Sequence, residues 1–437
     1  MTAATAKRAP WLLYGLLVVA FAAGFAKALA RPPAVPFQRP AVVVPANEAP
    51  KLRTRFVSSS AGPHRHAASL VELRDGRIRA FWFSGSREGA PDVVIRSAVF
   101  DPRNGRWGAE QTVADRAGTQ GAVLRYVKKL GNPVAERAAD GTLHLYYVTV
   151  SLGGWAGSSI TTTSSSDDGE TWSPARRVIS SPFLNVSTLV KGTPFHYADG
   201  TIGLPVYHEF LGKFGELLRL DATGAVLDKQ RLSDGRRALQ PVVLVQDGER
   251  ARVLMRHGDG GANRVLRSAT IDAGRHWTPA RETLLANPNA AVTGLAMPDG
   301  TLLAVLNDIE ANRDVLSLVA SNDGGANWRT IHILEDQQAS RERLVDPAVY
   351  AKAVKAQALV TDASLRDAAP FAESSVQHMC VAQRCSFEFS YPYLILTARG
   401  DAQLVYTWNR SFIKHVEFSG AWLARHLKES TKVPVDG

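Results

Sequence analysis

The sequence predicts an all-β fold, a β-propeller built from four-stranded blades. Short apolar or alternating segments have the length of strands, for example at 143–150, 241–254, 300–306 and 315–320. Asp-Gly turns punctuate the chain at 75–76, 140–141, 199–200, 247–248 and 299–300. A short motif also recurs between such segments. Blades around an axis accommodate this pattern without leaving long open sheet edges.

The recurring motif has the form S-x-D-x-G-x-x-W, with Thr replacing Ser in one copy. Its three copies are Ser165, Asp167, Gly169 and Trp172; Thr270, Asp272, Gly274 and Trp277; and Ser321, Asp323, Gly325 and Trp328. A degenerate fourth copy lies at 101–107. In a tight hairpin, Ser and Asp side chains satisfy exposed backbone donors and Gly adopts a conformation closed to other residues. We therefore predict that the motif is structural.

Composition and charge limit the function classes. The chain has 437 residues, 35 Gly, 23 Pro and a formal net charge of +10. Its Lys and Arg residues are scattered, and neither a dense basic tract nor a nucleic-acid-binding motif occurs, so we do not expect nucleic-acid binding. Some of the arginines could instead serve one anionic substrate.

The N-terminal residues predict export. Lys7 and Arg8 precede an apolar run at 11–26, which is followed by Ala28-Leu29-Ala30. We interpret residues 1–30 as a membrane-anchoring helix, with a cleaved signal peptide as the alternative. Residues 31–56 are rich in Pro and predict a linker. The predicted location is the cell envelope, anchored in the inner membrane with the propeller outside the cytoplasm, or secreted or periplasmic after cleavage.

The repeats carry a family resemblance over residues 57–425. The three in-phase motifs resemble the Asp boxes of the sialidase (neuraminidase), or BNR-repeat, superfamily, and Ser-Tyr-Pro at 390–392 with Tyr-Thr-Trp-Asn-Arg at 406–410 resembles its bacterial and plant subgroup. The resemblance implies a sialidase-like propeller of six blades. Residues 335–386 fall outside the pattern as an insertion, and 426–437 form a C-terminal tail. Cys380 and Cys385 in the insertion are either unrelated thiols or, in an exported domain, a disulfide.

The same resemblance implies a set of site residues. Asp92 matches the acid/base, Glu209 the carboxylate that assists the nucleophile, and Tyr391 the tyrosine nucleophile. The substrate-binding positions fall at His66, Arg87, Arg256 and Arg313. Arginines suit these positions because a guanidinium binds a carboxylate through two hydrogen bonds.

The sequence leaves alternatives at several of these positions. His66 stands where the family has an arginine, and Arg65 or Arg87 could fill that place instead. Glu216 competes with Glu209, and Asp92 could belong to an ordinary surface loop. The aromatic residues near Tyr391 are equally interpretable as core residues: Tyr393, Tyr406 and Trp408.

We therefore expect a sialidase-like retaining exo-glycosidase that cleaves a terminal, anionic sugar from a glycan or polysaccharide, without a metal or cofactor. The sugar could be a relative of sialic acid or a uronic acid. The alternative is a non-catalytic carbohydrate-binding or polysaccharide-assembly propeller of the cell envelope, and a third possibility is an envelope scaffold. Both site hypotheses require the predicted residues to meet at one end of the propeller axis.

Overall fold

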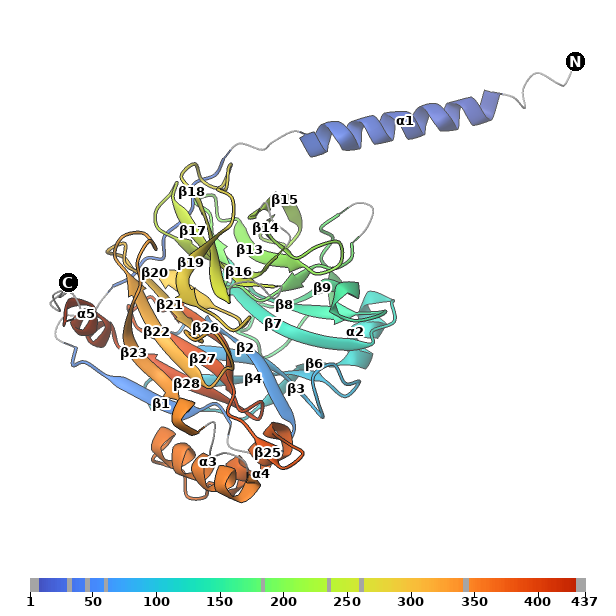
Figure 1. The fold of residues 1–437 in the computed structure, drawn as a ribbon. Coiled ribbons are helices and arrows are strands. Elements are labelled where there is room, and N and C mark those ends of the chain that lie inside the picture. The colour runs from blue at the N-terminus through green and yellow to red at the C-terminus, as the bar shows by residue number, and fades with distance from the viewer. Residues whose placement is uncertain are drawn as a thin grey trace, which may run out of the picture. The chain divides into compact units, whose positions relative to one another are not determined.

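The computed structural model describes residues 8–29, 34–43, 48–58, 62–181, 185–233, 237–258, 263–340 and 346–429. It divides into two units, Met1–Val35 and Pro36–Gly437, and the second contains every strand of the described chain. Figure 1 shows the strands of this second unit arranged as blades around a central axis. The predicted β-propeller is confirmed, and it has six blades in the described residues.

Each blade is an antiparallel sheet whose first strand lies nearest the axis. The first blade comprises β2 (His64–Glu72), β3 (Ile78–Gly85), β4 (Val94–Asp101), β5 (Arg106–Trp107) and β6 (Gln111–Ala114). The second comprises β7 (Lys129–Arg137), β8 (Leu143–Val150), β9 (Ser158–Ser165) and β10 (Arg176–Arg177). The third comprises β11 (Leu189–Val190), β12 (Phe195–His196), β13 (Ile202–His208), β14 (Phe214–Leu220) and β15 (Val226–Arg231).

The remaining three blades complete the ring. The fourth blade comprises β16 (Ala238–Val245), β17 (Ala251–His257), β18 (Arg264–Thr270) and β19 (Arg281–Ala286). The fifth comprises β20 (Thr293–Ala296), β21 (Leu302–Leu306), β22 (Val315–Ser321) and β23 (Arg329–Asp336). The sixth comprises β26 (Phe389–Leu396), β27 (Ala402–Trp408), β28 (Phe412–Phe418) and β1 (Leu52–Phe56). Strand β1 pairs antiparallel with β28, so residues from near the N-terminus close the last blade. This closure removes the open edge that a row of sheets would leave.

The Asp-Gly turns join first and second strands, as their sequence indicates. In the turn after β2, Gly76 has a φ of +81° and the Asp75 carboxylate accepts a hydrogen bond of 3.0 Å from the Arg77 amide. The same arrangement recurs after β7 at Asp140, with a hydrogen bond of 2.8 Å from the Thr142 amide. Glycine adopts this left-handed conformation without a steric penalty, so the turn is encoded locally.

The repeated motifs occupy the turns between third and fourth strands. In the copy that follows β9, Ser165 Oγ donates to Asp167 (2.6 Å) and accepts from the Gly169 amide (2.8 Å), while Trp172 Nε1 donates to the Gly169 carbonyl (3.0 Å). The Ser321 copy repeats these contacts within a few tenths of an ångström. The side chains therefore satisfy their own turn, which supports the predicted structural role.

The insertion between β23 and β26 is largely helical. It contains α3 (Pro347–Thr361), α4 (Ala369–Met379) and the hairpin β24 (Cys380–Val381) and β25 (Arg384–Cys385), which a Cys380–Cys385 disulfide closes. Phe371 of α4 stacks on Phe412 of the last blade with ring centroids 4.2 Å apart. The disulfide alternative is therefore correct, and the insertion is anchored to the last blade by aromatic packing.

Two shorter helices lie outside the repeat. Helix α2 (Arg116–Val123) precedes β7, and the carboxylate of Asp115 caps its N-terminus by accepting from Gly118. Helix α5 (Gly420–Glu429) follows β28 and buries Trp422 and Leu423 against the last blades, so part of the predicted tail at 426–437 is ordered helix.

Part of the predicted linker is also packed on the propeller. Phe37 is buried against Phe195 and Tyr197, and its amide donates 2.8 Å to the Gly248 carbonyl. Together with β1, these contacts show that the range 31–56 contributes to the propeller. A Pro-rich composition does not reveal this, because one buried aromatic side chain suffices to hold such a segment.

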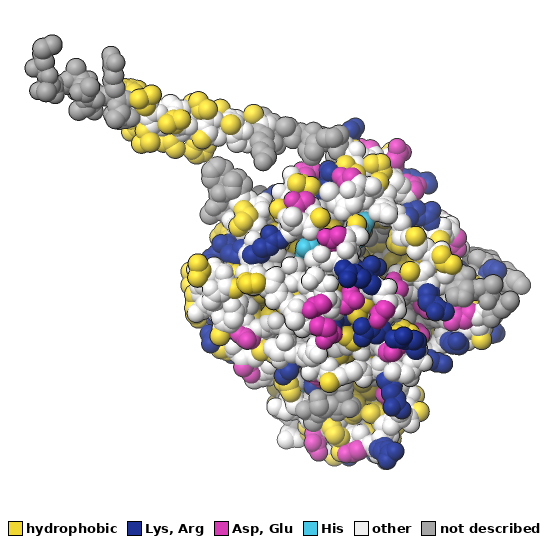
Figure 2. Space-filling model, turned by 180° about the vertical axis from the view of Figure 1, so that it is seen from behind, with side chains coloured by type: hydrophobic (Ala, Val, Ile, Leu, Met, Phe, Trp, Pro, Cys, Tyr) yellow, Lys and Arg dark blue, Asp and Glu magenta, His cyan; other side chains and the backbone are white. Residues whose placement is uncertain are grey.

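The apolar N-terminal run forms helix α1 (Arg8–Leu29) in the first unit. Within the residues that the structure describes, no helix combines the length and apolar character required to cross a membrane. The predicted membrane-anchoring helix is therefore not supported. On the propeller, Lys, Arg, Asp and Glu side chains are interspersed over the face seen in Figure 2, so the net positive charge is not gathered there.

Candidate active site

One end of the inner strands is built from six residues with positive φ, one in each blade. They are Ala67, Asn132, Ser187, Gln240, Asn289 and Tyr391, with φ between 44° and 61°. This backbone conformation costs a non-glycine residue about 1–3 kcal/mol and is concentrated at functional sites. Its recurrence at corresponding positions makes this end of the axis the candidate site.

In four blades the positive-φ residue lies at a β-bulge of the first strand. The register shifts between His66 and Ser69, Gly131 and Val134, Leu239 and Val242, and Ser390 and Tyr393. In three of these bulges a proline follows: Pro133, Pro241 and Pro392. Proline lacks an amide donor and suits an interrupted ladder. Each bulge interrupts the regular alternation of side chains along its strand.

Tyr391 lies at the centre of a hydrogen-bond network that crosses several blades. Its hydroxyl accepts from Gln240 Nε2 at 3.4 Å, and the same amide donates at 3.4 Å to the hydroxyl of Tyr207. Asn132 also donates to Tyr207, again at 3.4 Å. The ring of His66 lies 4.4 Å from the Tyr391 ring, between centroids. Tyr391 is half-buried, and the hydrogen bond from Gln240 orients its hydroxyl.

Three guanidinium groups form a row beside Tyr391. Arg256 donates to the Asn289 side-chain oxygen (2.6 Å) and to Gln240 (3.4 Å), and Arg313 donates to the Asn289 carbonyl (3.1 Å). The carboxylate of buried Glu388 lies 3.5 Å from Arg313 and 2.8 Å from Arg410. The row Arg256–Asn289–Arg313–Glu388–Arg410, here called the arginine row, joins the fourth, fifth and sixth blades.

Charge is unevenly balanced along this row. Glu388 partly neutralises Arg313 and Arg410, whereas the hydrogen bonds of Arg256 go to uncharged amide oxygens. A cavity of about 470 Å³ opens beside Arg313, Glu388 and Arg410. Such a set of oriented, incompletely neutralised guanidinium groups suits a carboxylate or another planar anion.

Glu209 lies at the end of β13, two residues after Tyr207. Its amide donates to the hydroxyl of Ser187 (2.9 Å), which fixes the backbone. Burial raises the pKa of Glu209, and the positive charge of Arg256 opposes this rise. Tyr391 and Glu209 in turn contribute to the raised pKa of Tyr207, after its burial. Glu209 is therefore electrostatically coupled to Arg256 and to Tyr207, which in turn is coupled to Tyr391.

Glu216, the competing carboxylate, has other partners. It lies 2.6 Å from His208 Nε2 and 3.8 Å from Lys229, within the third blade. Glu209 is consequently the better candidate for the site.

Asp92 and Arg87 lie together on the exposed loop between β3 and β4. The Asp92 carboxylate accepts from the amide and hydroxyl of Ser86, at 2.8 and 2.9 Å. Desolvation raises the pKa of Asp92, but the hydrogen bonds to its carboxylate and the charge of Arg87 together outweigh it and lower this pKa. Glu88, in the same loop, raises the pKa of Glu209 through its negative charge. The loop therefore approaches the centre of the site. Within the described structure, the Asp92 side chain is hydrogen-bonded to Ser86 and not to Tyr391, so its acid/base role remains a prediction.

His66 occupies the predicted position but supplies no charge. It is 4% exposed, and burial, assisted by His64, Arg410, Arg313 and Lys191, holds its pKa well below the ordinary value. Arg65 cannot replace the missing arginine, because it is buried in an ion pair with Glu110 at 3.2 Å. Arg410 instead brings a guanidinium to this side of the centre.

Tyr393, Tyr406 and Trp408 are core residues, each at most 1% exposed, in agreement with the alternative interpretation of these aromatic residues.

Sequence reasoning missed several groups of the site. The residues that join the network but were not predicted are Lys191, Gln240, Asn289, Glu388 and Arg410. A signal for three bulges existed in the dipeptides Asn132-Pro133, Gln240-Pro241 and Tyr391-Pro392.

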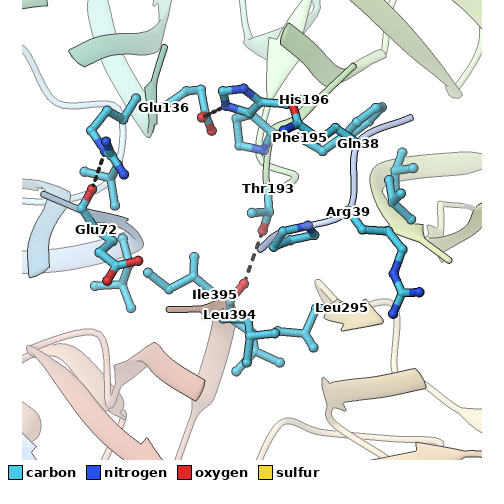
Figure 3. Close-up of a pocket in the computed structure, with 18 of the residues that line it drawn as sticks. Gln38, Arg39, Glu72, Glu136, Thr193, Phe195, His196, Leu295, Leu394 and Ile395 are labelled. Atoms are coloured by element: carbon cyan, nitrogen blue, oxygen red, sulfur yellow. Dashed lines mark hydrogen bonds and ion pairs between the residues drawn. The ribbon is translucent and has the colours of Figure 1, made fainter. Parts of the chain in front are cut away.

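The opposite end of the inner strands has a different character. A cavity of about 450 Å³ lies there, lined by Leu394, Ile395 and Leu295 and by the Gln38–Arg39 segment (Figure 3). Its polar groups are already paired: Glu136 lies 2.5 Å from His196, and Thr193 donates to the Leu394 carbonyl. None of the predicted site residues lines this cavity. Among the described residues, no group of three or more His, Cys, Asp or Glu side chains suits a metal ion.

Comparison with known proteins agrees with the fold. The family model described as a BNR repeat-like domain matches residues 76–404, so the chain belongs to this family. Similar solved structures include the Hadza microbial sialidase Hz136, which is 16% identical with a TM-score of 0.58 over 80% of this chain and 65% of that one. The chain thus spans about two thirds of that sialidase structure.

Two further structures have comparable similarity. A Dyadobacter fermentans protein of unknown function is 11% identical with a TM-score of 0.61, covering 84% of this chain and 99% of that one. The intramolecular trans-sialidase from Ruminococcus gnavus is 12% identical with a TM-score of 0.56, covering 84% and 97%. No curated protein matches significantly. At these identities the likeness establishes the sialidase-like propeller fold alone.

Proposed function

We propose that this protein is a retaining exo-glycosidase of the sialidase type, which removes a terminal anionic sugar from a glycan or polysaccharide. The observation that carries the proposal is the arginine row beside Tyr391. Arg256 has only neutral hydrogen-bond partners there, and the hydroxyl of half-buried Tyr391 lies in the same network. A sugar carboxylate supplies the missing negative charge.

In the proposed reaction, the Tyr391 oxygen forms a bond to the anomeric carbon while the bond to the leaving oxygen breaks. Glu209 accepts the phenol proton, for which its raised pKa is suitable, and Asp92 donates a proton to the leaving oxygen. Water then attacks the anomeric carbon of the tyrosyl intermediate, with Asp92 accepting its proton. The phenol oxygen leaves and regains the proton from Glu209, so that retention results from two displacements.

The test is hydrolysis of aryl glycosides of sialic acid, uronic acids and neutral sugars by the full chain. Release of the aglycone from an acidic sugar, lost in Tyr391→Phe and in Asp92→Ala, is the expected result. Hydrolysis of neutral glycosides alone would contradict the anionic substrate, because the arginine row would then have no role. Inverted product stereochemistry, observed by NMR, would contradict the nucleophilic tyrosine.

A second function is favoured by two specific observations. The lowered pKa of Asp92 keeps its carboxylate ionised near neutral pH, and His66 replaces an arginine of the family pattern with an uncharged ring. Both features suit a carbohydrate-binding or assembly propeller that retains the anion site without turnover. Binding of acidic sugars that Arg256→Gln weakens, without hydrolysis of any glycoside in the panel, would establish this alternative.

We further propose that the protein acts outside the cytoplasm, in the cell envelope or secreted. The Cys380–Cys385 disulfide supports this proposal, since such bonds persist mainly in oxidising compartments. Recovery of the tagged chain in the cytoplasmic fraction, with both thiols free to alkylation, would contradict it.

A further inference from the structure

Lys191 is a buried lysine, and among the described residues it has no carboxylate partner. It directly follows β11 in the third blade and is 3% exposed, and its Nζ donates to the Pro392 carbonyl at 3.2 Å. The other buried lysine in the described part of the chain, Lys414 of β28, has its charge neutralised by Glu335 at 2.5 Å. Burying an unpaired charge costs several kcal/mol, so the isolated ammonium requires an explanation.

The ammonium lies directly beneath the candidate site. Nζ is 5.0 Å from the centroid of the Tyr393 ring and 5.8 Å from that of Tyr391. Its hydrogen bond holds the carbonyl of Pro392, next to the positive-φ residue Tyr391. Lys191 also acts on the buried His66 ring, as Arg313 and Arg410 do, which places it within the electrostatic field of the arginine row.

Several other titratable or charged groups lie around Lys191. Burial keeps His66 uncharged, and burial raises the pKa of both Tyr207 and Tyr393, which therefore stay neutral. Burial also raises the pKa of Glu209, and a guanidinium group carries a permanent charge. For Lys191, burial lowers the pKa to about 7.

We propose that Lys191 is a titratable positioning residue for anion binding, which takes up a proton when an anionic ligand occupies the arginine row. The ligand provides a negative charge near the ammonium, which has no carboxylate partner among the described residues. Because the coupling is reciprocal, protonated Lys191 in turn strengthens binding, so ligand affinity falls as the pH rises through neutrality. The inference rests on the proposed function, in that the site must bind an anion.

The test is titration calorimetry of the full chain with free N-acetylneuraminic acid and with glucuronic acid. We expect binding to be about tenfold weaker at about pH 8.5 than at about pH 6, with net proton uptake that appears as a dependence on buffer ionisation enthalpy. Lys191→Met should bind weakly with no such dependence. Lys191→Arg should bind well at both pH values, because a guanidinium stays charged.

A matched control separates the role of Lys191 from that of any buried lysine. The double variant Lys414→Met, Glu335→Gln removes the paired lysine with its partner and should keep the wild-type pH dependence. If Lys191→Met retained both the pH dependence and the proton uptake, the inference would be overturned while the proposed function stood. If wild-type protein bound neither acid at any pH, the proposed function would fail, and this inference with it.

A ligand-free measurement checks the buried charge directly. The folded-state pKa of about 7 lies below the unfolded value of about 10.4, so the unfolded chain binds more protons between these values. The free energy of unfolding should therefore rise with pH across this window in wild-type protein, relative to Lys191→Met. A constant difference between the two proteins would show that Lys191 does not titrate there, and would overturn the inference.

Discussion

The Asp-box turns and the axial positions are both products of the same repeat, but they behave in opposite ways. In the turns, corresponding residues are identical or, at Thr270, closely similar, and each Ser or Thr hydroxyl accepts from its own Gly amide. At the axis, the backbone conformation repeats while the side chains vary widely, from Ala67 to Tyr391. The repeat thus conserves contacts in one region and only geometry in the other.

This difference separates stability from function. Side chains that satisfy their own turn need no partner from another blade, so each motif can be repeated unchanged. The axial side chains bond across blades, as Gln240 does to Tyr391, and a repeat that placed the same residue six times could not form such an asymmetric site. Substitutions in the two regions should therefore affect different properties.

The largest effect is expected at the axis, for Tyr391→Phe. Loss of the hydroxyl should reduce turnover by at least about 10³-fold, because no neighbouring group can replace the nucleophile. Folding should be nearly unaffected, since the hydroxyl accepts only one long hydrogen bond from Gln240. Steady-state kinetics and thermal unfolding measure the two quantities. A variant that unfolds at a lower temperature but keeps the wild-type turnover rate per folded molecule would show that Tyr391 has a structural role.

The next effect concerns binding and compares two guanidinium groups of the arginine row. Arg256→Gln should weaken binding of an acidic sugar by about ten- to hundredfold, because Arg256 is partly buried and its hydrogen bonds go to uncharged amide oxygens. Arg410→Gln should weaken it by about threefold or less, since Arg410 is exposed and shares Glu388. Calorimetry with the same ligand measures both. Equal losses would contradict the uneven balance of charge along the row.

The same contrast explains how much of the fold the sequence predicts. The Asp boxes and Asp-Gly turns are local structures, because Asp75 and Ser165 accept hydrogen bonds from backbone amides only two to four residues away. Such turns can therefore be recognised from the sequence. Closure of the ring by β1 depends on pairing with β28 at the far end of the chain, which no local pattern encodes. Docking of Phe37 is missed for the same reason.

The site was predicted only as far as the family resemblance extends. The structure brings Tyr391, Arg256 and Arg313 together. Lys191 approaches the centre from a position without a motif, and Arg410 lies in a motif for which no site role was predicted. Buried Glu388 pairs with Arg410 of its own blade and with Arg313 of the fifth blade. The second of these pairs depends on the assembled ring and is absent from any single repeat.

A smaller effect, on stability, is expected in the turns. Ser321→Ala removes the donor to Asp323 and leaves the buried Gly325 amide without its acceptor. The free energy of unfolding should fall by about 1–3 kcal/mol, as is usual for an unsatisfied buried donor. Ligand affinity and turnover should stay at wild-type values at a temperature where the variant is folded. A loss of affinity larger than the loss of folded protein would show that turns and axis are coupled.

The smallest effect is the acid response of the same turn. Hydrogen bonds from Asn327 and Ser321 lower the pKa of Asp323 to about 2, below the unfolded value of about 3.9. The stabilisation is therefore complete above about pH 4 and is lost as the pH falls towards about 2. In Asp323→Asn the side chain cannot ionise, so the difference in unfolding free energy from wild type should shrink across this window. The change should be small because the carboxylate is exposed and water screens its charge. A difference that grew on acidification would mean that Asp323 is stabilised in its protonated form, contrary to the acceptor role that the motif gives it.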